Sequence, residues 1–263
     1  MRNRVDTWLQ RVQALLWSSN CALCGAPAQI PGVELCTGCA DDLRRNLSAC
    51  VSCAEPLSLD VPDAAQLQLQ CGACLRRTPR FDAAYCPFLY DYPLDHLIRG
   101  LKYRGQVAYG RLLGHLFVRE LRLHRAQPLP QLLIPVPLAY RRFRQRGYNQ
   151  AIELGRVIES QLGIPLRADV IERRRETAVQ AGLTRRARRR NIKGAFAMRV
   201  KFPADHVAII DDVITTGSTV DEISRVLKRA GVRRIEVWAL ARAAQAGLNT
   251  NSSAMPINTA MPK

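Results

Sequence analysis

The sequence predicts an α/β protein in two parts, a small four-cysteine zinc module followed by a larger Rossmann-like domain with a mostly parallel sheet. Three observations support this prediction. All nine cysteines lie between Cys21 and Cys86. After that point, segments with strand and helix patterns alternate, as they do where helices connect parallel strands. Near the end of the chain, an apolar run at 207–210 is followed by two aspartates, a Thr/Ser/Gly loop and a helical pattern.

The strong positive charge of the chain narrows the classes of partner. Its 263 residues include 39 Lys and Arg against 22 Asp and Glu, a formal net charge of +17. Such a surface attracts nucleic acid, acidic lipid or phosphorylated small molecules, although a solvated basic face predicts the same composition. No apolar run approaches the roughly 20 residues that a membrane span requires. We therefore expect a cytoplasmic protein, whose clustered thiols stay reduced and bind metal.

Residues 1–19 predict a short amphipathic helix rather than a signal peptide. Trp8, Val12 and Leu15 recur at helical spacing, whereas Asp6 and Gln13 interrupt any continuous apolar stretch. The helix is expected to pack on the next module, with docking to a membrane or a partner as the alternative.

Residues 20–78 predict a double zinc-ribbon module, because eight of the cysteines form four C-x-x-C pairs. Zinc favours four thiolates in a tetrahedron, so two such pairs complete a closed structural site. A cross-braced arrangement of the first and third pairs also fits the spacing, with one or two ions in total, and free or redox-active thiols are the non-metal alternative. Cys86 is expected to be a buried core residue. The simplest assignment places one ion on Cys21, Cys24, Cys36 and Cys39, and another on Cys50, Cys53, Cys71 and Cys74.

Residues 81–243 predict the α/β domain, and its elements follow from hydrophobic periodicity and Gly or Pro boundaries. An Arg-rich segment that begins near 170–171 is expected to loop out. The polar residues 244–263 are expected to be a disordered tail. Strands are expected at 83–90, 132–134, 207–210 and 235–240, and helices at 94–103, 107–124, 148–162 and 218–230.

Residues 207–219 form a strand–loop–helix unit that suits a ribose phosphate. The strand delivers Asp211 and Asp212 to the carboxyl end of the sheet, where they can hold two ribose hydroxyls or a hydrated Mg²⁺. The loop leads into a helix, so its amides and hydroxyls can surround a phosphate, and Gly217 permits close approach. An ordinary helix cap by Ser218 or Thr219 is the alternative. The predicted contacts are Asp211, Asp212, Val213, Thr215, Thr216, Gly217, Ser218 and Thr219, with the two aspartates as the catalytic candidates.

Further short motifs accompany this unit along the chain: Leu-Lys-Tyr-Arg-Gly at 101–105, Pro-Val-Pro-Leu at 135–138, Arg-Gly-Tyr-Asn-Gln at 146–150 and Arg-Asn-x-x-Gly-Ala-Phe at 190–196. Residues 207–219 are similar to the phosphoribosyl pyrophosphate (PRPP) signature of type I phosphoribosyltransferases. Together with the cysteine pairs, these motifs resemble the ComF family, which includes ComFC and GntX-like proteins. That family is linked to competence and the use of external DNA. The resemblance spans about residues 21–242, and it implies a type I phosphoribosyltransferase fold that binds PRPP with Mg²⁺.

The resemblance also implies roles for basic segments outside the PRPP signature. A pyrophosphate loop should begin at 135–137, and it departs from the usual short loop because it is long and rich in arginine. A flexible loop at 173–191 should close over PRPP. Guanidinium groups suit this role because they bind phosphate oxygens in pairs and keep their charge, although each basic residue alone fits a solvated charge equally well. The candidates are Lys102, Pro137, Arg146, Tyr148, Thr177, Gln180, Arg185 and Arg190.

Two functions remain open. One is a PRPP-binding protein of DNA uptake that contacts single-stranded DNA and competence-machinery proteins. Tyr140, Phe143 and Tyr148 interleave with arginines at 141–146, as a stacking platform requires, although packing against the sheet edge is the alternative for these rings. The other is an active Mg-dependent phosphoribosyltransferase with an unknown small nitrogenous acceptor and no connection to DNA. In relatives a variable hood binds the base, and the zinc module occupies that end of the chain.

Overall fold

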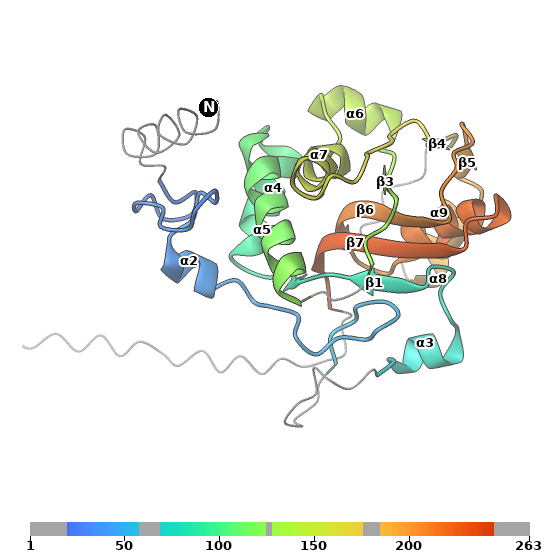
Figure 1. The fold of residues 1–263 in the computed structure, drawn as a ribbon, viewed down its shortest axis with the longest axis horizontal. Helices are drawn as coiled ribbons and strands as arrows, with labels where there is room; N and C mark the ends of the chain where they lie inside the picture. Colours follow the sequence, from blue (N-terminus) through green and yellow to red (C-terminus); the bar gives the residue numbers. More distant parts are fainter. Residues whose placement is uncertain (1–19, 58–68, 125–127, 176–184, 245–263) are drawn as a thin grey trace, which may run out of the picture.

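The computed structural model describes residues 20–57, 69–124, 128–175 and 185–244 (Figure 1). The predicted helix at 1–19, the tail from 245 onward and the candidates Thr177 and Gln180 lie outside these ranges. Within them, no helix is long and apolar enough to cross a membrane.

A parallel sheet forms the centre of the larger domain, as predicted. Its strand order is β1-β7-β6-β3, with β2 also paired to β7, and every one of these pairings is parallel. Because the two central strands are covered on both faces, they are almost continuously apolar. The strands are β1 (Ala83–Tyr85), β2 (Phe88–Leu89), β3 (Leu132–Pro135), β6 (His206–Ile214) and β7 (Arg234–Arg242).

Two strands differ from the prediction. The segment expected as one strand at 83–90 is two short strands on the same neighbour. Strand β6 runs beyond the expected 207–210, because its pairing with β7 continues through Asp211 to Ile214. The two aspartates therefore lie within a buried strand, and their backbone is held by the ladder.

Helices cover both faces of the sheet, and successive residues of β6 alternate between the two cores. Ala208 and Ile210 face one core and Val207 and Ile209 face the other, as the two-residue period of a strand requires. Helices α4, α5 and α7 gather on one side (Figure 1), whereas α8, α9 and the β4–β5 hairpin belong to the other core. These elements are α4 (Leu94–Tyr103), α5 (Ala108–His124), α7 (Gln150–Leu162), β4 (Ile171–Arg173), α8 (Arg185–Ile192), β5 (Phe196–Met198) and α9 (Ser218–Arg229).

Two Arg-rich segments that were expected as loops contain helices. One is α6 (Tyr140–Arg146), which ends at Gly147 in the left-handed conformation with φ +82°. The other is α8, at the end of the expected flexible loop. Arginine is a good helix former, and Gly147 supplies the left-handed residue with which many helices end. The high charge of the two segments indicated loops, although their arginines favour helices.

The cysteine-rich segment does not pack as one unit. Its first half, with α2 (Thr37–Asp41), joins the core under α4 and α5. Its second half, with α3 (Gly72–Arg76), joins the core on the α9 side. Figure 1 shows α2 and α3 at well-separated places around the sheet. Within the described residues, the two halves of the predicted module at 20–78 therefore pack on different faces of the α/β domain.

Candidate functional site

Asp211 and Asp212 lie near the carboxyl end of β6, where Asp212 is 3% exposed. Lys102, in the last turn of α4, makes an ion pair with Asp212. The pairing follows from strand geometry, because Asp212 has the same parity as Ala208 and Ile210 and so faces the α4 side. The sequence motif at 101–105 thus delivers a lysine to the predicted acidic pair.

The electrostatics of the two aspartates differ. Burial favours the neutral form of Asp212, but the Lys102 charge outweighs it and lowers the Asp212 pKa. Burial likewise opposes the charge of Lys102, and Asp212 overcomes this effect and raises the Lys102 pKa. Asp211 is different: burial and then the neighbouring Asp212 charge raise its pKa well above the ordinary value. The structure therefore favours the charged form of Asp212, which is paired with Lys102, and the neutral form of Asp211.

The loop after β6 leads directly into α9. Gly217 occupies the position before the first helical residue with φ +71°, and no side chain at that position caps the helix. A Cβ on Gly217 would meet no protein atom nearer than Ile214 Cγ2 at 3.9 Å, so within the protein this glycine is needed for its positive φ. Thr216 Oγ1 lies 2.9 Å from Ser218 Oγ and accepts a long bond from the Ser218 amide.

A small pocket surrounds this loop. Every residue from Val213 to Val220 lines it, together with Asp211. Asp212 is turned away toward Lys102, and so the structure separates the two aspartates that the sequence motif places side by side. The amino end of α9, a helix of 12 residues, supplies a partial positive charge to the pocket.

A second groove opens beside Lys102, between the end of α4 and helix α6. Lys102, Tyr103, Arg142, Gln145 and Arg146 line it with Gly105. The Arg146 guanidinium lies over the Tyr103 ring at 5.8 Å and donates a hydrogen bond to Gln150.

The remaining predicted contacts divide between the two sides of the molecule. Tyr148 donates its hydroxyl to the carbonyl of Leu101, which fixes the start of α7 against α4. Pro137 is half-buried at the start of the segment that leads to α6. Arg190 is exposed on α8, which packs against α9, and only the backbone of Arg185 is described. Lys102, Arg146 and Tyr148 thus lie near the carboxyl end of α4. Arg190 lies on α8, in the part of the fold that packs against α9.

The first two C-x-x-C pairs form one cluster, and the last two pairs form a second cluster. In each cluster the four sulfurs lie within 4.8 Å of one another. The closest recorded separations are 3.7 Å for Cys24–Cys36 and 3.7 Å for Cys53–Cys71. A tetrahedral ion with sulfur ligands at about 2.3 Å requires sulfur–sulfur separations of about 3.8 Å, whereas a disulfide requires about 2.05 Å. The clusters are therefore Cys21, Cys24, Cys36 and Cys39, and Cys50, Cys53, Cys71 and Cys74.

Backbone amides add to the fit with zinc. The Cys39 amide donates to Cys36 Sγ at 3.4 Å, and the Cys71 amide donates to Cys50 Sγ at 3.2 Å. Hydrogen bonds from the Cys53 thiol and from nearby amides lower the pKa of Cys50 to about 4. A closed set of four sulfurs with no open position suits a structural ion rather than a catalytic one.

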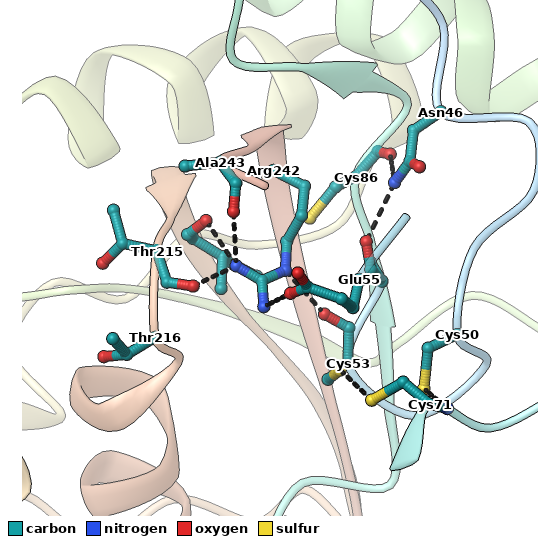
Figure 2. Close-up of polar contacts among 12 residues, drawn as sticks. Asn46, Cys50, Cys53, Glu55, Cys71, Cys86, Thr215, Thr216, Arg242 and Ala243 are labelled. Carbon is teal, nitrogen blue, oxygen red and sulfur yellow. Dashed lines mark hydrogen bonds and ion pairs between the residues drawn. The ribbon is translucent and has the colours of Figure 1, made fainter. Parts of the chain in front are cut away.

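Sequence reasoning missed Arg242, which the structure places between the second cluster and the loop (Figure 2). Arg242 is the last residue of β7 and is 1% exposed. Its guanidinium contacts Glu55 on one side and the carbonyls of Ile214 and Thr215 on the other. The only available signal was a charged residue that directly follows the apolar run at 237–241.

Known proteins resemble this chain over most of its length. The family described as "Phosphoribosyl transferase domain" matches residues 149–258. Competence protein F of Haemophilus influenzae is 38% identical over 229 residues, which cover 85% of this chain and 96% of that protein. DNA utilization protein YhgH of Salmonella typhi is 35% identical over 225 residues, or 84% of this chain and 96% of that protein. YhgH of Escherichia coli strain K12 is 33% identical over 226 residues, with 84% and 96% covered. This chain therefore belongs to the competence protein F (ComF) family, with a type I phosphoribosyltransferase domain and two four-cysteine clusters that fit a double zinc ribbon.

Proposed function

We propose that this protein binds PRPP with Mg²⁺ at residues 211–219 and acts in the uptake and use of DNA. The observation that carries the proposal is the placement of Asp211 in the same pocket as the loop at the amino end of α9. The names of the relatives, competence protein F and DNA utilization protein, support the link to DNA. Thiols grouped for metal rather than for disulfides support action in the cytoplasm.

Each part of PRPP has a chemical counterpart in this arrangement. The 5′-phosphate suits the amides of residues 216–219 at the positive end of α9. The ribose hydroxyls suit the Asp211 side chain, which lines the same pocket as the loop and can bond two neighbouring hydroxyls. The pyrophosphate suits the groove that Lys102 and Arg146 line. Bound Mg²⁺ would offset the negative charge of the pyrophosphate.

Single-stranded DNA contact is the second part of the proposal, and helix α6 supports it. Tyr140 and Phe143 on this helix are 68% and 46% exposed, and Tyr103 across the groove is 77% exposed. Exposed arginines at 141, 142 and 144 surround these rings. Aromatic faces stack on bases while guanidinium groups follow the phosphates, so α6 has the composition of a single-strand platform next to the PRPP groove.

Transfer of the phosphoribosyl group to a small nitrogenous acceptor is the alternative function. It is favoured by a pocket between the second cysteine cluster and the loop, which Cys74, Arg77, Phe81, Thr216 and Gly217 help to line. An acceptor held there would lie beside the ribose phosphate. Catalysis would then depend on positioning and on electrostatic stabilisation of an oxocarbenium-like transition state.

Calorimetric titration of PRPP into the protein with Mg²⁺ tests the proposal. We expect saturable binding in the wild type and at least a roughly tenfold loss in Asp212→Asn, because this variant loses the ion pair that positions Lys102 beside the pyrophosphate groove. Asp169→Asn is the matched control, since Asp169 is a surface carboxylate paired with Arg167 and lies outside the loop. Equal affinity in Asp212→Asn and Asp169→Asn would contradict the site.

A further inference from the structure

Arg242 connects the second cysteine cluster to the loop at 215–217 through the interior of the protein. Its side chain makes hydrogen bonds or ion pairs with groups from two segments that are far apart in sequence, 53–55 and 214–215 (Figure 2). A buried guanidinium carries a large desolvation penalty unless its donors are satisfied. The position of the Arg242 side chain therefore depends on the groups that accept its hydrogen bonds.

On the loop side, Arg242 fixes two successive peptide groups. Its Nη1 donates to Ile214 O at 2.9 Å and also to Thr215 O. A trans peptide is planar, with its N–H directed opposite to its C=O. Carbonyls that point toward Arg242 therefore turn the amides of Thr215 and Thr216 away from it. The guanidinium thus sets the orientation of the peptide groups with which the loop begins.

On the metal side, Arg242 contacts the C-x-x-C turn at 50–53 directly. Its Nε donates to Cys53 O at 3.1 Å, and its Nη2 pairs with the Glu55 carboxylate, which is 7% exposed. Ala54, between these two residues, has φ +55°, a conformation that L residues with a Cβ rarely adopt. Asn46 Nδ2 holds the Ala54 carbonyl at 2.9 Å. The turn is therefore held in one shape, and that shape directs Cys53 O and Glu55 at Arg242.

The first cluster offers an internal comparison. It is fastened to the other core, where Tyr109 donates its hydroxyl to Ala22 O at 3.3 Å and Arg111 pairs with Glu34. Among the hydrogen bonds and ion pairs recorded for the described residues, none joins residues 20–39 to residues 211–219. The two clusters have the same four-thiol chemistry, but within the described part of the chain only the second touches the loop through a charged side chain.

We propose that Arg242 is a positioning residue through which metal in the second cluster sets the conformation of the PRPP loop. This inference rests on the proposed PRPP function of residues 211–219. Four sulfurs on one ion hold the turn at 50–53 rigid, and therefore hold Cys53 O and Glu55 in place. When the cluster is incomplete, Arg242 loses the fixed partners on one side, and the carbonyls of Ile214 and Thr215 lose a fixed donor. Affinity for PRPP thus depends on metal in the second cluster more than on metal in the first.

Amide NMR of the full chain without PRPP tests this coupling independently of function. We expect Cys71→Ser to displace the Thr216 and Gly217 amide signals, and Cys36→Ser to displace them much less. Glu55→Ala should displace the same signals, whereas Glu55→Gln, which keeps an acceptor oxygen for Arg242, should restore most of their positions. Equal displacement by Cys36→Ser and Cys71→Ser, or none by Glu55→Ala, would overturn the proposal.

PRPP affinity supplies the second readout. Arg242→Lys keeps the charge but cannot bond both sides at once, so its dissociation constant should rise about tenfold, the effect of roughly one lost hydrogen bond. Leu240→Ala is the matched control, because it truncates a buried residue of the same strand that faces the core. Equal affinity in these two variants would overturn the positioning role while leaving PRPP binding intact. A wild type that binds no PRPP, with loop signals that still respond to Cys71→Ser and Glu55→Ala, would overturn only the proposed function.

Discussion

Asp211 and Asp212 are adjacent in sequence, yet their environments push their pKa values in opposite directions. Lys102 accounts for the lowered pKa of Asp212. Burial, followed by the negative charge of Asp212, accounts for the raised pKa of Asp211. The sequence could predict two acids at a strand end, because the residue types are plain. It could not predict their division of roles, because the lysine arrives from a helix far earlier in the chain.

Asp211→Asn should stabilise the ligand-free protein at neutral pH. In the unfolded chain Asp has a pKa of about 3.9, and in the folded protein the pKa of Asp211 is higher. Between these two values the folded state binds more protons than the unfolded state, so stability falls as pH rises through this window. Thermal unfolding from about pH 4 to about pH 8 should show this loss in the wild type and a smaller loss in Asp211→Asn.

The contrasting variant for this experiment is Asp169→Asn. The Arg167 side chain lowers the pKa of Asp169, so its stabilisation is present above the ordinary pKa and is lost in acid. Removing that carboxylate should not raise the melting temperature at neutral pH. The assigned pKa direction of Asp211 would be wrong if Asp211→Asn and Asp169→Asn behaved alike.

At the scale of elements, the structure confirms helices and strands that hydrophobic periodicity predicted. Helices at 94–103 and 218–230 and strands at 132–134 and 235–240 recur within one or two residues, because each has an apolar face that must be buried. Strand β6 is longer than its apolar run because the ladder to β7 continues past it. Helix α6 was missed because its face is exposed and basic, so no apolar period marks it.

Helix α6 should carry a measurable share of the salt dependence of DNA binding. If Arg141, Arg142 and Arg144 contact phosphates, their replacement by Gln should reduce the log–log salt slope for single-stranded DNA by about 0.7 per lost contact. Replacing Lys201, Arg229 and Arg233 removes the same charge from exposed sites at the amino end of the sheet, and should leave the slope nearly as it was. A flat salt response, or equal slopes in the two triple variants, would refute the platform.

At the scale of the whole molecule, the two cysteine clusters hold opposite faces of one domain. The cysteine count and spacing predicted the ligands, and a cross-braced alternative remained open until the sulfur positions separated the two groups. Nothing in the sequence predicted the contact of Arg242 with Glu55, which joins residues 187 positions apart. Such a contact depends on the finished fold, so neither spacing nor composition can anticipate it.

Metal analysis tests the sequential pairing. We expect two zinc ions per chain in the wild type, and the loss of one ion in each of Cys36→Ser and Cys71→Ser, because each cluster is closed on its own. A single ion in the wild type would contradict two independent sites. Loss of both ions from either variant would instead favour sharing of ligands between them.

The central claim is that a ribose phosphate binds in the loop between β6 and α9. Amide NMR during titration with PRPP and Mg²⁺ tests it most directly. We predict that the largest changes fall on residues 215–219, where the amides meet the pocket. Inorganic phosphate at high concentration should reproduce part of that pattern. If the largest changes lie instead on α6 or on the cysteine clusters, with the loop signals unmoved, the loop is not the PRPP site.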